Sequence, residues 1–224
     1  MNGYLFDTHI HTKESSRCGD VAAADVVARY KELGYDGIII TDHMHASNLR
    51  YKGETYEEKV NGFLEGYKAA KALEDDRFRV ILGMELRFPE NDNDYLVYGF
   101  DEEFVFNHNF LENFATLEDF VPFAKENGLV IYQAHPFRCG ITVTDPELVD
   151  GVEVYNGHGG HDSRNDIAYH WATKFSLPML SGSDYHYTSQ MEPGGIYFEE
   201  LPLNSYDVAN LIKSQKYSLK TFTK

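Results

Sequence analysis

Histidines and carboxylates recur in this sequence at short, repeated spacings that suit metal binding. His9 and His11 stand two residues apart, and Asp184 and His186 repeat that spacing. On an extended strand, residues two apart point to the same face. Imidazole and carboxylate together are typical ligands of Zn, Mn or Fe rather than of Mg or Ca alone. The spacing therefore predicts a transition-metal site toward which both pairs of side chains point.

Other candidate ligands each follow an apolar run. His43 comes after Ile-Ile-Ile-Thr-Asp, Glu85 after Val-Ile-Leu-Gly-Met, and His135 after Val-Ile-Tyr-Gln-Ala. A single histidine in such a place is more often structural, but the repetition at several strand ends favours one shared site. A carboxylate such as Glu85 can bridge two ions that lie about 3.5–4 Å apart in two-metal hydrolases.

The segments that must position these residues are short apolar runs in alternation with amphipathic stretches. Strands are expected at residues 4–6, 36–41, 79–84, 95–99, 129–134, 151–155 and 177–181. Helices are expected at residues 22–33, 56–73, 117–126, 163–175 and 205–214. This alternation predicts a parallel sheet buried on both faces. In a closed α/β barrel the active site lies where the strands end. An open doubly wound sheet is the alternative, but no Gly-rich phosphate loop follows the first run.

Composition narrows the classes of protein and partner. A chain of 224 residues with 42% hydrophobic residues suits one domain, residues 1–224. The net charge of −16 disfavours an extended nucleic-acid partner, because that affinity comes from Lys and Arg. Two cysteines make no disulfide framework. We expect no signal peptide, no membrane span and a cytoplasmic location; the sequence does not specify the oligomeric state.

The ordered motifs resemble those of the polymerase-and-histidinol-phosphatase (PHP) superfamily. A lone HxH motif is a weak signal, whereas the ordered set spans residues 7–186 and is specific. The motifs are Asp7-Thr8-His9-Ile10-His11-Thr12, Ile40-Thr41-Asp42-His43, Gly83-Met84-Glu85, Ala134-His135-Pro136-Phe137-Arg138 and Ser183-Asp184-Tyr185-His186.

The resemblance implies an α/β fold, a distorted (β/α)7 TIM-like barrel with a metal site at the C-terminal ends of its strands. It also implies two or three divalent ions (Zn, Mn or Fe) and hydrolysis of phosphoester bonds. The ligands that it implies are His9, His11, Glu85 and Asp184 for a first ion, Glu85 and His135 for a second, and His43 and His186 for a third.

Two places depart from the family pattern. The family's second ion usually has another histidine, and the matching residue here is Asp94, a harder ligand that would tolerate Mn or Fe. After the HxH motif, many members have Ser-Asp-Gly or a histidine for the third ion. Asp20 is the best carboxylate candidate here, at a longer spacing, and Cys18 is a further candidate.

A compact chain with a strongly acidic surface favours a small phosphorylated substrate, either a phosphomonoester or a nucleotide, over a polymer. Arg138 or Arg17 could hold its phosphate by paired hydrogen bonds, although each could equally brace a loop. His43 or His186, where not bound to metal, could protonate the leaving oxygen. The loops at residues 44–56, 88–94 and 155–163 are expected to select the substrate.

Other polar residues are assigned supporting or structural roles. Asp7 is expected to orient one of the HxH imidazoles, and Asp42 and Asn156 could act similarly. His45 could line the pocket, but a solvated loop position is favoured. Surface or packing positions are expected for His108, His158, His161 and His170.

Two rival functions fit less well than a phosphoesterase. Metal-dependent amidohydrolases also open with HxH, but they typically add a carboxylated lysine on a central strand. This sequence has Glu85 there and no lysine at a strand end. The changes at Asp94 and around Asp20 would also suit a metal-binding module without catalysis.

Overall fold

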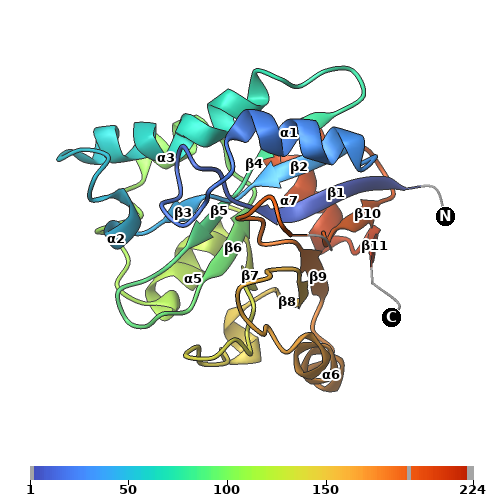
Figure 1. Cartoon of the computed structure of the whole chain (residues 1–224). Helices are drawn as coiled ribbons and strands as arrows, with labels where there is room; N and C mark the ends of the chain where they lie inside the picture. Colours follow the sequence, from blue (N-terminus) through green and yellow to red (C-terminus); the bar gives the residue numbers. More distant parts are fainter. Residues whose placement is uncertain (1–2, 191–192, 221–224) are drawn as a thin grey trace.

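The computed structural model describes residues 3–190 and 193–220 and has an α/β fold with two mixed sheets (Figure 1). One sheet has the order β11-β10-β1-β2-β4. Its strands are β1 (Tyr4–Ile10), β2 (Gly37–Ile40), β4 (Arg79–Leu82), β10 (Ile196–Phe198) and β11 (Tyr217–Leu219). The other has the order β3-β5-β6-β7-β8-β9. Its strands are β3 (His43–Met44), β5 (Met84–Leu86), β6 (Tyr95–Tyr98), β7 (Val130–Gln133), β8 (Gly151–Asn156) and β9 (Met179–Gly182).

The two sheets adjoin because the chain passes directly from one to the other. β4 runs into β5 through Gly83, where a side-chain Cβ would come within 3.0 Å of Ile39 and Thr41. On the other side, β1 meets the segment after β9 through a bridge between Ile10 and Tyr185. The strands from β1 through β9 therefore follow the order expected for the barrel, but they form two sheets rather than one continuous ring of paired strands.

Strand β6 runs antiparallel to both of its neighbours, β5 and β7. No helix separates β5 from β6, so the chain turns back directly and the expectation of a wholly parallel sheet is wrong here. The reversal places the beginning of β6 beside the ends of β5 and β7. A residue that precedes β6 therefore reaches the same edge as residues that follow the other strands.

Helices cover the outside of the sheets and bury their apolar faces. They are α1 (Ala23–Glu32), α2 (Ala46–Leu49), α3 (Tyr56–Lys71), α4 (Glu102–Asn107), α5 (Leu117–Glu126), α6 (Asn165–Phe175) and α7 (Ser205–Lys213), with a 3-10 turn at Pro146–Leu148. The Thr55 and Thr116 side chains begin α3 and α5 with capping boxes. In Figure 1, α1 and α3 lie together over β1, β2 and β4.

The expected helices and strands are confirmed to within a few residues. The short elements α2, α4, β3, β10 and β11 were not expected, because runs of two to six residues carry little periodicity. Both cysteines lack a disulfide partner within the described residues, as expected. In the described part of the chain, no helix combines the length and the apolar character that a membrane crossing needs. That the chain forms one domain stays a prediction.

Candidate metal centre

The side chains of the HxH motif converge with two carboxylates at the ends of the strands. His9 Nε2 lies 3.1 Å from His11 Nε2 and 3.2 Å from Glu85 Oε1. Asp184 Oδ1 lies 3.4 Å from His9 Nε2 and 3.2 Å from His11 Nε2. All four residues are buried. These are the four residues expected to hold the first ion, and the structure brings them together.

Glu153 fixes the orientation of the His9 ring. Its Oε1 is 3.0 Å from His9 Nδ1, and because a carboxylate only accepts, Nδ1 carries the proton. The Nε2 atom of a neutral His9 therefore presents a lone pair to the cluster. Gly182 makes room for this pair, since a Cβ there would lie 2.5 Å from His9 Cβ and 2.6 Å from Glu153 Oε1.

Ser16 and Asp42 fix the His11 ring in the same sense. Ser16 Oγ donates to Asp42 Oδ1 at 2.6 Å and lies 3.1 Å from His11 Nδ1. Because the hydroxyl has one proton and gives it to Asp42, His11 Nδ1 must be the donor in its contact with Ser16. A neutral His11 then presents its Nε2 lone pair directly toward that of His9.

The lone pairs of His9 Nε2 and His11 Nε2 face each other across 3.1 Å, so they repel unless a cation lies between them. Two buried ring nitrogens around the cluster, His135 Nδ1 and His161 Nε2, also have no hydrogen-bond partner among the described residues, whereas Glu85 Oε2 and His43 Nδ1 lie 2.7 Å from each other as an ion pair. Each unsatisfied buried group costs about 1–3 kcal/mol. Imidazole nitrogens and carboxylate oxygens in this arrangement fit a divalent transition metal, so the residues suit the ions that the resemblance implies.

A second candidate position lies between Glu85 and His135. His135 Nε2 is 3.2 Å from Glu85 Oε1 and 3.8 Å from Asp94 Oδ2. Asp94 immediately precedes the reversed strand β6, which explains how it reaches this edge, and it is buried. Arg87 donates to both of its oxygens at 2.7 Å, and Arg138 Nη2 lies 3.5 Å away. The structure therefore places Asp94 at the cluster rather than in a solvated turn.

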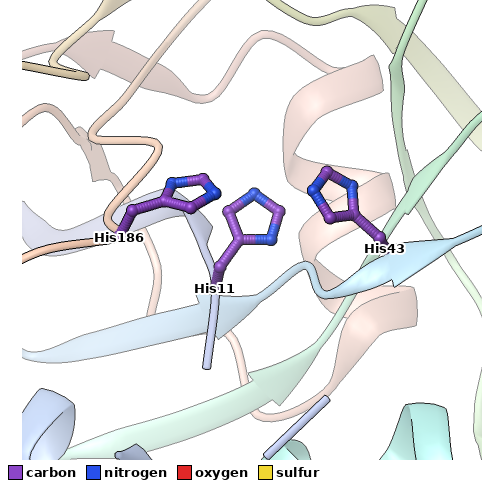
Figure 2. Close-up of side chains that lie close together, drawn as sticks. All are labelled: His11, His43 and His186. Carbon is purple, nitrogen blue, oxygen red and sulfur yellow. The ribbon is translucent and has the colours of Figure 1, made fainter. Parts of the chain in front are cut away.

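A third candidate position is formed by His11, His43 and His186, whose rings lie in a row (Figure 2). One ligand nitrogen from each lies within 4.8 Å of the others. His43 Nδ1 is also 2.7 Å from Glu85 Oε2, which connects this position to the first. Cys18 Sγ lies 3.2 Å from His43 Nε2 and 3.0 Å from His186 Nε2.

Two of the candidate ligands, His135 and Asp184, adopt left-handed backbone conformations. The φ angle is 29° at His135 and 47° at Asp184. Residues other than glycine rarely occupy this region, and such strain concentrates at functional sites. Glu153 supports the first by accepting a hydrogen bond from the His135 backbone N–H at 3.0 Å.

The charges of the cluster shift its pKa values strongly. Burial alone would lower the pKa of His9, but the carboxylates of Asp184, Glu153 and Glu85 raise it well above its ordinary value. Burial alone would raise the pKa of Glu85, but His43 and His9 hold it well below the usual range. The metal-free His9 ring therefore binds a proton, and a metal ion has to displace it.

Several other candidates lie apart from the cluster or act differently from the expectation. The Asp20 side chain is exposed, and its backbone N–H donates to the His186 carbonyl at 2.9 Å. Arg17 stacks on Tyr51, with its guanidinium carbon 4.3 Å from the ring centroid. These contacts give no support to Asp20 as a ligand or to Arg17 as a phosphate contact.

Of the three residues expected to support the ligands, two act on a ligand side chain and one does not. Asp7 accepts from the backbone N–H of His9 at 3.1 Å and of Ser183 at 3.0 Å, so it joins β1 to the segment after β9 rather than orienting an imidazole ring. Asp42 acts on His11 through Ser16. Asn156 donates to Asp184 Oδ2 at 3.2 Å, in keeping with its expected supporting role.

Three of the remaining histidines have structural positions. His45 begins helix α2 by accepting from the Asn48 N–H at 3.2 Å. His108 packs against Phe104 and Phe123, as the packing interpretation expects. His170 is exposed on α6.

Sequence reasoning missed three residues of the site. Glu153 could have been found, since a charged residue between Val152 and Val154 in a buried strand needs a partner. His158 and His161 stack with ring centroids 4.2 Å apart, and His161 Nε2 lies 3.7 Å from Asp184 Oδ2. The surface or packing interpretation did not anticipate that their glycine-rich loop folds back toward Asp184, since no local pattern indicates such a contact.

Comparisons with known proteins identify the family and the fold. The model of the PHP domain family matches residues 7–221. No curated protein matches the sequence. PsfC from Pseudomonas syringae PB-5123 matches with a TM-score of 0.72 and 18% identity, over 100% of this chain and 93% of PsfC.

Two other solved structures show the same fold. A two-domain protein from Bacteroides vulgatus ATCC 8482, described as containing a predicted PHP-like metal-dependent phosphoesterase, matches with a TM-score of 0.60 and 16% identity. That match covers 96% of this chain and 64% of the other. An amidohydrolase from Chromobacterium violaceum, solved with sulfate and without metal, matches with a TM-score of 0.51, 16% identity and 98% coverage of both chains.

Proposed function

The chain belongs to the PHP domain family, and from that premise we propose that it is a metal-dependent phosphoesterase that hydrolyses a small phosphomonoester or nucleotide. The observation that carries the proposal is the convergence of His9 Nε2 and His11 Nε2, 3.1 Å apart, on the buried carboxylates of Glu85 and Asp184. Divalent cations held there supply positive charge for phosphate oxygens and a water of lowered pKa.

The side chains around the cluster suit phosphate binding. Arg138 lies beside Asp94, and its side chain is 25% exposed, which leaves guanidinium donors for a substrate oxygen. Arg87 is committed to both oxygens of Asp94 and serves mainly to position that carboxylate. Arg138 is therefore the stronger candidate for contact with the phosphate.

His161 suits the transfer of a proton to the leaving oxygen. Its Nδ1 is 3.1 Å from Ser163 Oγ, while its Nε2 has no hydrogen-bond partner among the described residues. Its Nε2 lies 3.7 Å from Asp184 Oδ2, so a proton donated from this atom would reach a leaving oxygen at the edge of the cluster. His43 and His186, the donors expected from sequence, are better placed as metal ligands.

A pocket of about 260 Å³ near the cluster suits the organic part of a small substrate. It is lined by His45, Arg87, Phe88 and Asn91 among others. The His45 ring lies 5.1 Å from the His43 ring, and Arg87 pairs with Asp94. Most of the pocket residues come from the segments after β3 and β5, where two of the loops expected to select the substrate lie, and Phe110 and Leu111 come from the segment after α4.

The proposal is tested by elemental analysis of the purified protein together with phosphate release from a panel of phosphomonoesters and nucleotides, with added Mn or Zn. Bound metal with turnover supports the proposal. Bound metal with hydrolysis of amides alone would favour the amidohydrolase alternative, and bound metal without any turnover the non-catalytic module. A protein that binds no metal would overturn the proposal.

A further inference from the structure

The loop after β1 brings a sulfur atom into the row of histidines. Cys18 Sγ is 3.0 Å from His186 Nε2 and 3.2 Å from His43 Nε2. Neither histidine belongs to this loop, since His43 lies in β3 and His186 follows β9. Three segments that are distant in the sequence thus direct potential metal ligands toward one point.

The hydrogen bonds around His186 determine which of its nitrogens faces the sulfur with a lone pair. Its Nδ1 is 2.9 Å from the Asp184 carbonyl oxygen, which can only accept. Nδ1 is therefore the donor, and a neutral His186 presents an Nε2 lone pair to Cys18. In the metal-free protein protons occupy these ring nitrogens. Once both rings are neutral, a single thiol proton cannot satisfy both lone pairs, whereas one metal ion can be bound by the sulfur and both nitrogens.

A second, independent indication of a ligand at this point comes from the imidazoles themselves. His43 Nε2 faces Cys18 Sγ at 3.2 Å, while the other ring nitrogen, Nδ1, lies 2.7 Å from Glu85 Oε2. His11, His43 and His186 also place one nitrogen each within 4.8 Å of one another. The sulfur therefore adds to an existing cluster of nitrogen ligands.

The backbone on both sides of Cys18 is held in place. The Arg17 N–H donates to Asn48 Oδ1 at 3.0 Å, and the Gly19 N–H donates to the Ser16 carbonyl at 3.1 Å. The Asp20 N–H donates to the carbonyl of His186 itself at 2.9 Å. These bonds direct Cys18 toward the histidines while the Asp20 side chain stays exposed.

We propose that Cys18 is a thiolate ligand of the third metal ion, together with His43 and His186, in place of the carboxylate expected at Asp20. The inference rests on the proposed metal centre, but not on the identity of its substrate. A sulfur and two imidazoles form a softer ligand set than the carboxylate-rich first position. The third position should therefore prefer Zn or Co over Mn, so that one protein holds ions of different kinds.

The test is a titration of the metal-free protein with Co(II), followed by near-ultraviolet and visible absorption. The intact protein should develop an intense thiolate-to-cobalt charge-transfer band. Cys18→Ser should lose that band and about one bound ion per chain, while Cys139→Ser, which changes the other exposed cysteine, should keep both. Cys18→Asp should restore the ion without the band, which shows that the loop still folds.

A second readout locates the sulfur directly. X-ray absorption of the zinc-loaded Cys139→Ser protein should contain a Zn–S distance of about 2.3 Å. Cobalt binding with no charge-transfer band, or a band that survives in Cys18→Ser, would overturn the inference and leave the rest of the metal centre intact. A Cys18-dependent band in a protein that hydrolyses no phosphoester would support the inference while the proposed function fails.

Discussion

The metal centre has two halves that are built in different ways. The strand half consists of His9, His11, Glu85, His135 and Asp184, which lie on or just after β strands and are buried. The loop half consists of Cys18, His158 and His161, which lie in loops and retain solvent exposure. Buried residues elsewhere in the fold, such as Glu153 and Ser16, hold the strand half. The comparison suggests that the sheets determine where the first ion binds, while the loops adjust metal choice and substrate handling.

The most severe way to test this division is to remove the first pair of ligands. The double substitution His9→Ala and His11→Ala should abolish metal binding at the first position and reduce phosphate release to background, because it removes both converging nitrogens of that position. Circular dichroism should remain that of a folded α/β protein. His108→Ala should change neither metal content nor turnover, because His108 packs against Phe104 and Phe123.

A subtler change in the strand half leaves every proposed ligand in place. Glu153→Gln removes the charge that holds the His9 ring and weakens its bond to the His135 backbone. We expect a loss of about 10–100-fold in metal affinity, measured by competition with a chelator. Glu147→Gln, at an exposed position, is the matched control. An unchanged affinity in Glu153→Gln would show that the ring needs no such support.

A lower pH should weaken metal binding across the whole centre, because protons compete with metal ions for the imidazole nitrogens. Burial would lower the pKa of His186, but Asp184 raises it to about 10, and the pKa of His9 is also raised. Because both rings are protonated in the metal-free protein at neutral pH, metal binding must release protons. Affinity should therefore weaken as pH falls, by about tenfold per pH unit for each proton displaced. Calorimetry in buffers of different ionisation enthalpy would count those protons, and a count of zero would contradict the assignment.

The smallest effect on metal content is expected in the loop half, at His161. His161→Gln should leave the bound metal unchanged and lower turnover by about 10²–10⁴ for substrates with poor leaving groups, since it removes the proposed proton donor. An activated ester such as p-nitrophenyl phosphate should be affected much less. Equal losses for both kinds of ester would argue that His161 positions the substrate instead.

The same division explains what could be predicted from the sequence. A ligand such as His135 or Asp184 follows an apolar run, so its place at the sheet edge could be predicted from a local pattern. Asp94 could be identified as a candidate ligand, but its position at the sheet edge could not be derived from a local pattern. That position follows from the reversal of β6, which depends on the pairing of three strands. The contacts of Cys18 and His161 depend on how loops fold over segments far away in the chain. Short-range patterns carry no information of that kind.

The partnerless ring nitrogens of the metal centre also link metal supply to the amount of folded protein. These atoms lower the stability of the metal-free native state. An ion that binds only the folded chain raises the free energy of unfolding by about 2.7 kcal/mol when its free concentration is one hundred times its dissociation constant. A change of that size alters the population open to proteases many-fold. In a cell short of the metal, we expect the chain to be degraded faster, so that its abundance follows metal availability without a dedicated regulator.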